Sequence, residues 1–164
     1  GVGKTTLAKV IFRQFRKKGH FDKPAWVCVS QNPSIVELLR DIAEALGMRL
    51  SGDGELAARA LLTTRFKMER KYLLVLDDVW GRLWRDIGIP IGWFHSGSRV
   101  LITTRDEETC QQIESHQSIK VDVLSEEDAW TLFKSKAGDA VFNSADLESV
   151  GSFVVNYCGG LPLA

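Results

Sequence analysis

The chain has 164 residues, with 21 lysines and arginines against 21 aspartates and glutamates, so its formal net charge is zero at pH 7. This balance gives no overall field that favours nucleic acid or an anionic membrane surface, which excludes a general polyanion binder but leaves a specific anion site open. No apolar run approaches the roughly 20 residues of a membrane-spanning helix. Cys28, Cys110 and Cys158 are odd in number and far apart, which favours reduced thiols in the cytoplasm, or alternatively the nucleus, over disulfides or a zinc site.

The chain opens on Gly1-Val2-Gly3-Lys4-Thr5-Thr6, which matches the second half of the phosphate-loop pattern G-x-x-x-x-G-K-[ST]. In such loops the glycines let backbone N–H groups converge on phosphates, the lysine neutralises outer-phosphate charge, and the next hydroxyl reaches a magnesium ion. A complete loop follows an apolar strand and three further residues, so we expect this chain to be a piece of a longer protein. The alternative is a glycine-rich tag or an ordinary helix cap.

The next hundred or so residues alternate helical patterns with short apolar runs. In chain order, the patterns predict a helix from about residue 5 to 18, a strand at 25–30, a helix at 35–46 capped by Asn32-Pro33-Ser34, a helix at about 56–68, and strands at 71–77, 98–104 and, more weakly, 119–123. Strands that alternate with helices predict right-handed crossovers and a parallel sheet, so the fold class is α/β.

From Leu124 onward the patterns are helical only. Ser125 and the three acids after it are typical of a helix N-terminus, and a loop at about 138–143 separates that helix from a last one at about 146–157. We therefore expect a nucleotide-binding sheet domain at 1–124 and the start of a helical subdomain at 125–164.

Two carboxylates, Asp77 and Asp78, follow the most apolar predicted strand. A buried parallel strand delivers such groups to the edge where ligands bind, so Asp77 can meet a magnesium ion held by Thr5. Asp78 can orient or deprotonate a water that faces the outer phosphate. The alternative is a solvated acidic strand end.

Arg105 follows Thr103-Thr104 at the end of another predicted strand. An arginine at that edge can bind a terminal phosphate through its fork of donors, and so report whether the phosphate is present. The alternative is that Arg105 caps the sheet edge or pairs with Asp106.

Taken together, these residues resemble the NB-ARC region of plant nucleotide-binding, leucine-rich-repeat immune receptors, a family of signal-transduction ATPases with the P-loop NTPase fold. The matching blocks occur in the family's order and read GVGKTTLAKVIF, FDKPAWVCVSQNPSIVELLRDIAEALG, KYLLVLDDVW, GSRVLITTRD, VDVLSEEDAWTLFKSKAG and CGGLPLA.

The resemblance implies a role for each matching residue. It implies nucleotide binding by Gly1, Val2, Gly3, Lys4, Thr5, Thr6, Arg105 and Pro162, magnesium contacts by Thr5 and Asp77, and catalysis by Asp78. Pro162 would pack near the adenine, although a proline there also suits a helix start. Trp80 resembles the subgroup whose N-terminal domain is a coiled coil.

Several family parts have no counterpart in the 164 residues: the first strand of the sheet, the second helical subdomain, the winged helix and the repeats. Residues 88–96 fit the family's variable loop only loosely. The family's first strand lies next to the strand that ends at Arg105, so we expect the isolated piece to fold poorly, because strands beside the gap would expose unpaired backbone.

The resemblance implies an ADP/ATP switch in defence: ADP marks the resting state, ATP the active one, and slow hydrolysis resets it. Its implied partners are leucine-rich-repeat and coiled-coil domains and further copies of itself. Two alternatives stay open, a true motor or metabolic ATPase and a non-functional resistance-gene-like fragment.

Overall fold

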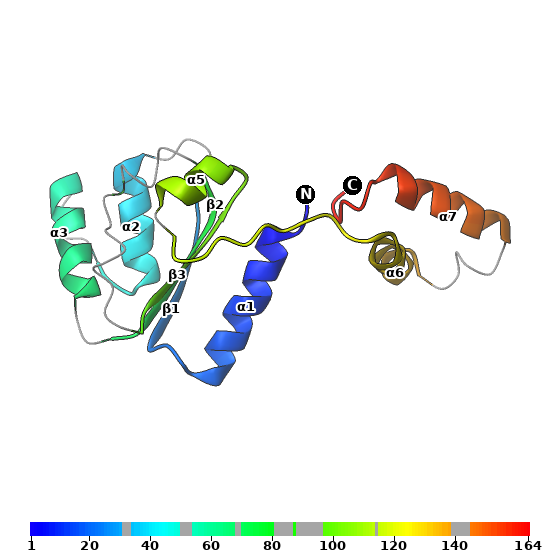
Figure 1. Cartoon of the computed structure of the whole chain (residues 1–164). Coiled ribbons are helices and arrows are strands. Elements are labelled where there is room, and N and C mark those ends of the chain that lie inside the picture. Colours follow the sequence, from blue (N-terminus) through cyan, green and yellow to red (C-terminus); the bar gives the residue numbers. More distant parts are fainter. Residues whose placement is uncertain are drawn as a thin grey trace. The chain divides into compact units, whose positions relative to one another are not determined.

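A computed structural model describes residues 1–30, 34–49, 54–67, 70–80, 87, 97–113, 115–138 and 145–164. Contacts divide the chain into a sheet unit, Thr5–Ser118, and a helical unit, which combines Gly1–Lys4 with Ile119–Ala164. In chain order the elements are α1 (Lys4–Lys18), β1 (Lys23–Cys28), α2 (Ile35–Ala45), α3 (Glu55–Phe66), β2 (Tyr72–Val79), β3 (Arg99–Thr104), α5 (Glu107–Gln112), α6 (Glu126–Ala137) and α7 (Ala145–Tyr157), coloured along the chain in Figure 1.

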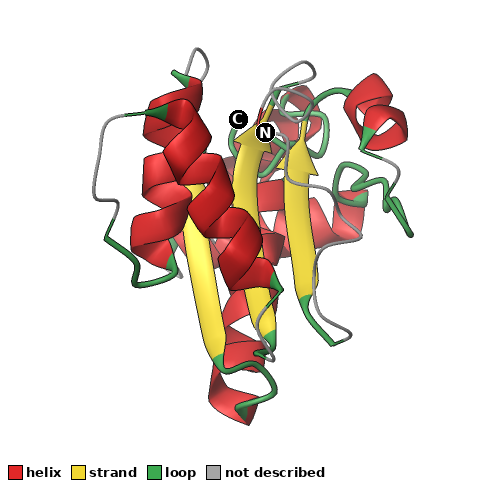
Figure 2. Cartoon of the chain, turned by 90° about the vertical axis from the view of Figure 1, so that its left-hand side faces the viewer, coloured by secondary structure: helices red, strands yellow, loops and turns green. Residues whose placement is uncertain are grey.

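The sheet unit contains a three-stranded parallel sheet in the order β1-β2-β3. Figure 2 shows the strands side by side, with α2 and α3 in front of them. Leu74 at the centre of β2 pairs with Ala25 on one side and with Val100 on the other. The predicted α/β fold with a parallel sheet is confirmed.

Alternate residues of β2 serve two different cores, because successive side chains of a strand point to opposite faces. Leu74 and Leu76 belong to the larger core, which α2 and α3 cover. Leu73 and Val75 belong to a smaller core with Ala8 of α1. Figure 1 shows α1 on the side of the sheet opposite α2 and α3. Covering both faces explains why the sequence of β2 is a continuous apolar run.

Several predicted element bounds, and one predicted cap, differ in the structure. The ladder of β1 with β2 runs from the pair Lys23 and Tyr72 to the pair Cys28 and Asp77, so β1 begins and ends two residues before the predicted strand at 25–30. Ser34 holds the N-cap position of α2, but its side chain makes no cap hydrogen bond. The rest of that predicted cap, the loop at 88–96 and most of the loop after Gly138 lie outside the described residues.

The predicted strand at 119–123 is wrong, since these residues form no strand. Apolar and charged residues do alternate there, but Ile119 and Val123 are exposed and Lys120 pairs with Asp122 at 3.3 Å, which shows an extended segment without a packed face. The sequence reading also missed α5. This short helix begins where the Asp106 carboxylate accepts a hydrogen bond from the Glu108 N–H at 3.0 Å.

In the helical unit, the predicted cap of α6 is confirmed: the Ser125 hydroxyl accepts a hydrogen bond from the Asp128 N–H at 3.1 Å. Gly151 of α7 lies against α6, where an added Cβ would come within 3.0 Å of the Phe133 ring and 3.2 Å of the Trp130 ring. A glycine at this position therefore lets the two helices pack closely. Across the described part of the chain, no helix combines the length and the apolar character that a bilayer crossing needs.

Candidate functional site

The carboxyl ends of β2 and β3 meet the first turn of α1 around the carboxylate of Asp77. The Thr5 hydroxyl donates a hydrogen bond to Oδ1 of Asp77 at 2.9 Å, and the Thr103 hydroxyl donates to the same oxygen at 2.6 Å. Asp77 is 6% exposed and Thr103 is 8% exposed. The fold thus joins residues 72 positions apart in one buried polar cluster.

A β-bulge separates the two consecutive carboxylates. Leu76 pairs with Ile102 and Val79 pairs with Thr104, so Asp77 and Asp78 together stand opposite Thr103. Strand alternation would place residue 78 on the same face as Leu76, yet Val79 occupies the core on that face. Asp78 is therefore the inserted residue, and bulges of this kind re-aim side chains next to functional sites.

The backbone of Asp78 reflects this insertion. Its φ is 64°, which makes Asp78 the only non-glycine residue with positive φ in the described ranges. Aspartate tolerates this left-handed region better than most residues do. The Asp78 N–H donates to the Thr103 hydroxyl at 2.9 Å, so the amide freed by the bulge is satisfied.

Arg105 pairs with the re-aimed carboxylate. Its Nε lies 3.1 Å from Oδ1 of Asp78, one terminal nitrogen lies 3.5 Å from Oδ2, and its Cζ is 5.6 Å from the Trp80 ring centroid. Asp106, the alternative partner, instead caps α5. With 63% of the Arg105 side chain and 33% of the Asp78 side chain exposed, such a pair contributes about 0 to 1 kcal/mol, so a competing anion can break it.

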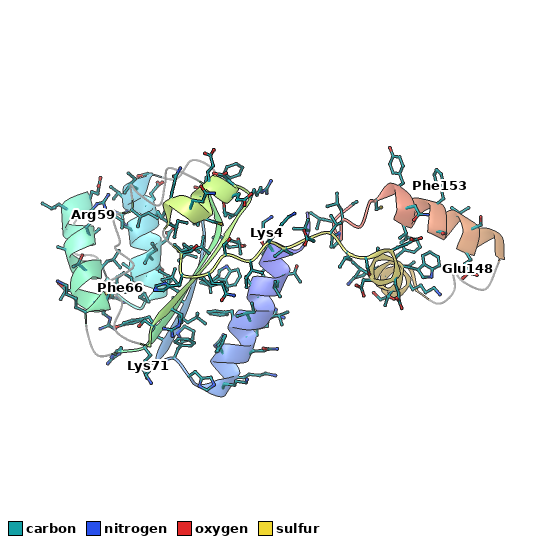
Figure 3. The ribbon with its side chains drawn as sticks, in the orientation of Figure 1. Lys4, Arg59, Phe66, Lys71, Glu148 and Phe153 are labelled. Carbon is teal, nitrogen blue, oxygen red and sulfur yellow. The ribbon has the colours of Figure 1, made fainter. Side chains whose placement is uncertain are left out.

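The loop residues Gly1 to Lys4 belong to the helical unit, and Thr5 and Thr6 continue them into α1. Lys4 is the first residue of α1 (Figure 3), at the helix end that attracts anions. Gly3 has a φ of 97°. An added Cβ on Gly1 would come within 2.9 Å of the Cβ of Leu163, so the start of the loop lies against the residue that follows Pro162.

Pro162 lines a hollow of about 130 Å³ in the helical unit. Most of the lining side chains are apolar, among them those of Leu124, Leu132 and Phe133. Such a lining suits a flat apolar group better than a phosphate.

The donors around Asp77 fit a magnesium ion. Carboxylate and hydroxyl oxygens are its preferred ligands, and in phosphate sites one or two carboxylates are usually completed by phosphate oxygens and water. Oδ2 of Asp77 has no hydrogen-bond partner among the residues that the structure describes. Within the same ranges no group of three His, Cys, Asp or Glu side chains could hold a metal ion.

Thr103 is the member of this cluster that sequence reasoning missed. In Thr103-Thr104-Arg105 the sequence pattern indicates a role for the arginine but none for either hydroxyl. The available signal was a polar residue at the carboxyl end of a buried parallel strand, the position from which side chains reach a ligand.

A parallel α/β sheet whose strand ends meet a helix begun by Gly-Lys-Thr defines the P-loop NTPase class of domains. Residues 1–143 match the NB-ARC domain family, and the chain belongs to that family of nucleotide-binding domains. It is 39% identical over 170 residues to the disease resistance protein At4g27190 of Arabidopsis thaliana and 35% identical over 169 residues to the disease resistance protein RGA2 of Solanum bulbocastanum. Both matches cover the whole chain but only 17% of the relative. The resemblance to plant disease-resistance proteins is confirmed.

Proposed function

We propose that this chain is the adenine-nucleotide switch of a plant immune receptor, resting with ADP and active with ATP. Membership of the NB-ARC family and relatives named as disease resistance proteins support the proposal. The observation that carries the switch is the ion pair between Asp78 and Arg105.

This pair joins the candidate base to the candidate phosphate sensor. While the guanidinium binds Asp78, neither group is free to act on a phosphate or on an attacking water. A terminal phosphate offers Arg105 more negative charge and more acceptor oxygens than a carboxylate does, and the exposed pair is weak. Gaining that phosphate therefore moves Arg105 and frees Asp78, which is the differential contact that a nucleotide switch requires.

The other site residues take roles that suit their positions. Lys4 neutralises the outer phosphates, and Gly1, Val2, Gly3 and Thr6 contribute backbone N–H groups to the phosphates. Thr5 and Asp77 would hold Mg²⁺, which when bound would neutralise negative charge on the phosphates.

Pro162 packs near the adenine. We assign residues 1–124 to the nucleotide-binding domain and 125–164 to a helical subdomain. Leucine-rich-repeat and coiled-coil domains of the whole receptor, and self-association on activation, would transmit its state. The free cysteines suit the cytoplasm or nucleus.

The test is to purify the full-length gene product with its nucleotide and identify that nucleotide by chromatography. We expect a retained adenine nucleotide, its loss in Lys4→Arg, and its retention as ATP in Asp78→Asn, because that change removes the base but not the phosphate contacts. Lys9→Arg, at an exposed position of the same helix, is the matched control and should retain nucleotide.

Two results would contradict the proposal. The switch fails if the wild-type protein carries no adenine nucleotide, and the division of roles fails if both Lys4→Arg and Asp78→Asn lose it. Steady turnover above about one per second, which is in the ordinary enzyme range, would identify a true ATPase instead.

A further inference from the structure

We propose that Thr103 is a positioning residue for the metal site, and that its hydroxyl sets both the Asp77 carboxylate and the inserted Asp78. The inference rests on the proposed nucleotide function. It adds a residue that touches neither the metal nor the phosphate.

The first observation is that the Thr103 hydroxyl is both a hydrogen-bond donor and a hydrogen-bond acceptor. It donates to Oδ1 of Asp77 at 2.6 Å and accepts from the Asp78 N–H at 2.9 Å. Since the Thr5 hydroxyl also donates to Oδ1, that oxygen is held from two sides and Oδ2 is left for a cation. A hydrogen-bonded partner that orients a metal-binding carboxylate in this way strengthens metal binding without contacting the metal.

The second observation is the bulge. Thr103 stands opposite both aspartates, so its hydroxyl is where the extra residue of β2 is accommodated. Without that acceptor, the Asp78 N–H at the bulge loses its partner, which favours the regular register. In a regular strand Asp78 would face the apolar core under α2 and α3 and would not lie beside Arg105. Thr103 therefore keeps Asp78 beside Arg105.

Thr104 offers a contrast within the same strand. Its hydroxyl accepts from the Asp106 N–H at 3.1 Å and lies 3.4 Å from the Asp106 carbonyl oxygen, so among the described residues its hydrogen bonds are to the turn into α5. Thr104→Val therefore removes the same hydroxyl group one residue away, and we expect it to leave Asp77 and Asp78 unchanged.

The experiment measures Mg²⁺ binding apart from activity. The full-length gene product is freed of nucleotide, and a fluorescent ADP analogue is titrated in EDTA and at increasing Mg²⁺. For Thr103→Val we expect the Mg²⁺ needed for half-maximal tightening to rise about 10- to 100-fold, with affinity in EDTA changed by less than about threefold. Thr103→Ser, which keeps the hydroxyl, and Thr104→Val should match the wild type.

Every outcome decides the inference. A wild-type Mg²⁺ response in Thr103→Val overturns it, as does an equal loss of affinity with and without Mg²⁺. If Thr103→Val does not fold, Thr103→Ala replaces it with the same expected shift. Failure of both to fold, or loss of the Mg²⁺ response in a folded Thr103→Ser, also overturns it. A wild-type protein that binds no adenine nucleotide refutes the proposed function itself.

Discussion

The sheet unit and the helical unit are stabilised in different ways. In the sheet unit, Tyr72, Leu74 and Leu76 of β2 are fully buried, and helices cover both faces. In the described part of the helical unit, Val155 is the only buried hydrophobic residue, while Phe153 and Tyr157 are 71% and 87% exposed. The sheet unit carries its own core. The helical unit is held by caps, close backbone contacts and the packing of α6 on α7.

The largest difference in unfolding free energy should come from truncating one phenylalanine to alanine in each unit. Phe66 is fully buried and packs edge-on against Tyr72 with ring centroids 6.0 Å apart, whereas Phe153 projects from α7 (Figure 3). Phe66→Ala should lower the unfolding free energy of the sheet unit by about 3 to 5 kcal/mol. Phe153→Ala should change that of the helical unit by less than about 0.5 kcal/mol. Urea unfolding of the full-length gene product, read by hydrogen exchange of β2 and α7 peptides, measures both. Equal losses would refute the contrast.

The second-largest loss of unfolding free energy should come from Gly160→Ala in the helical unit. Gly160 has a φ of 72°, its carbonyl accepts from the Leu124 N–H at 2.8 Å, and an added Cβ would overlap the Leu124 carbonyl oxygen. Gly160→Ala should cost the left-handed penalty of about 1 to 2 kcal/mol and, in addition, the overlap.

Gly159→Ala is the matched control for this prediction. Residue 159 also has positive φ but meets no atom within 4 Å, so only the left-handed penalty applies. Hydrogen exchange of α6 and α7 should show the larger loss for Gly160→Ala. Identical losses would mean that the contact with Leu124 contributes nothing.

The smallest effect should come from helix caps. Ser125→Ala removes the hydroxyl that caps α6 and should cost about 1 kcal/mol, whereas Ser34→Ala at the start of α2 should be nearly neutral because that hydroxyl makes no cap bond. Opening of the first turn of each helix by hydrogen exchange is the measurement. Greater opening at α2 than at α6 would contradict the prediction.

Sequence patterns correctly predicted the helices and strands that bury an apolar face, because burial leaves an apolar pattern in the sequence. The apolar run before Asp77 is short, which favours a covered strand over a helix, and α1, α2 and α3 follow from helical spacing and end signals. The same logic was wrong for 119–123, because alternation shows only that a segment could pair, whereas a strand needs a neighbour. The helix α5 was missed because Glu107–Gln112 lacks an apolar stripe and depends on a local cap by Asp106.

Site residues were predictable as types, and Asp77 was expected close to Thr5, but the pairing of Asp78 with Arg105 was not predicted. Asp77, Asp78 and Arg105 stand out because polar groups follow buried strands. That Arg105 binds Asp78 and not Asp106 depends on the bulge, and two adjacent aspartates give no sign of which residue is inserted. Thr103 was not predicted for the same reason, because its role depends on its position opposite both Asp77 and Asp78.

The contact between Arg105 and Trp80 has a spectroscopic consequence. A cation above an indole ring alters the field in which the excited state forms, so the emission of Trp80 depends on where Arg105 lies. With the other four tryptophans of these 164 residues replaced by phenylalanine, Trp80 becomes a fluorophore already in place beside Arg105. If Arg105 exchanges Asp78 for a phosphate as proposed, the emission of Trp80 would follow that exchange in real time and without a label.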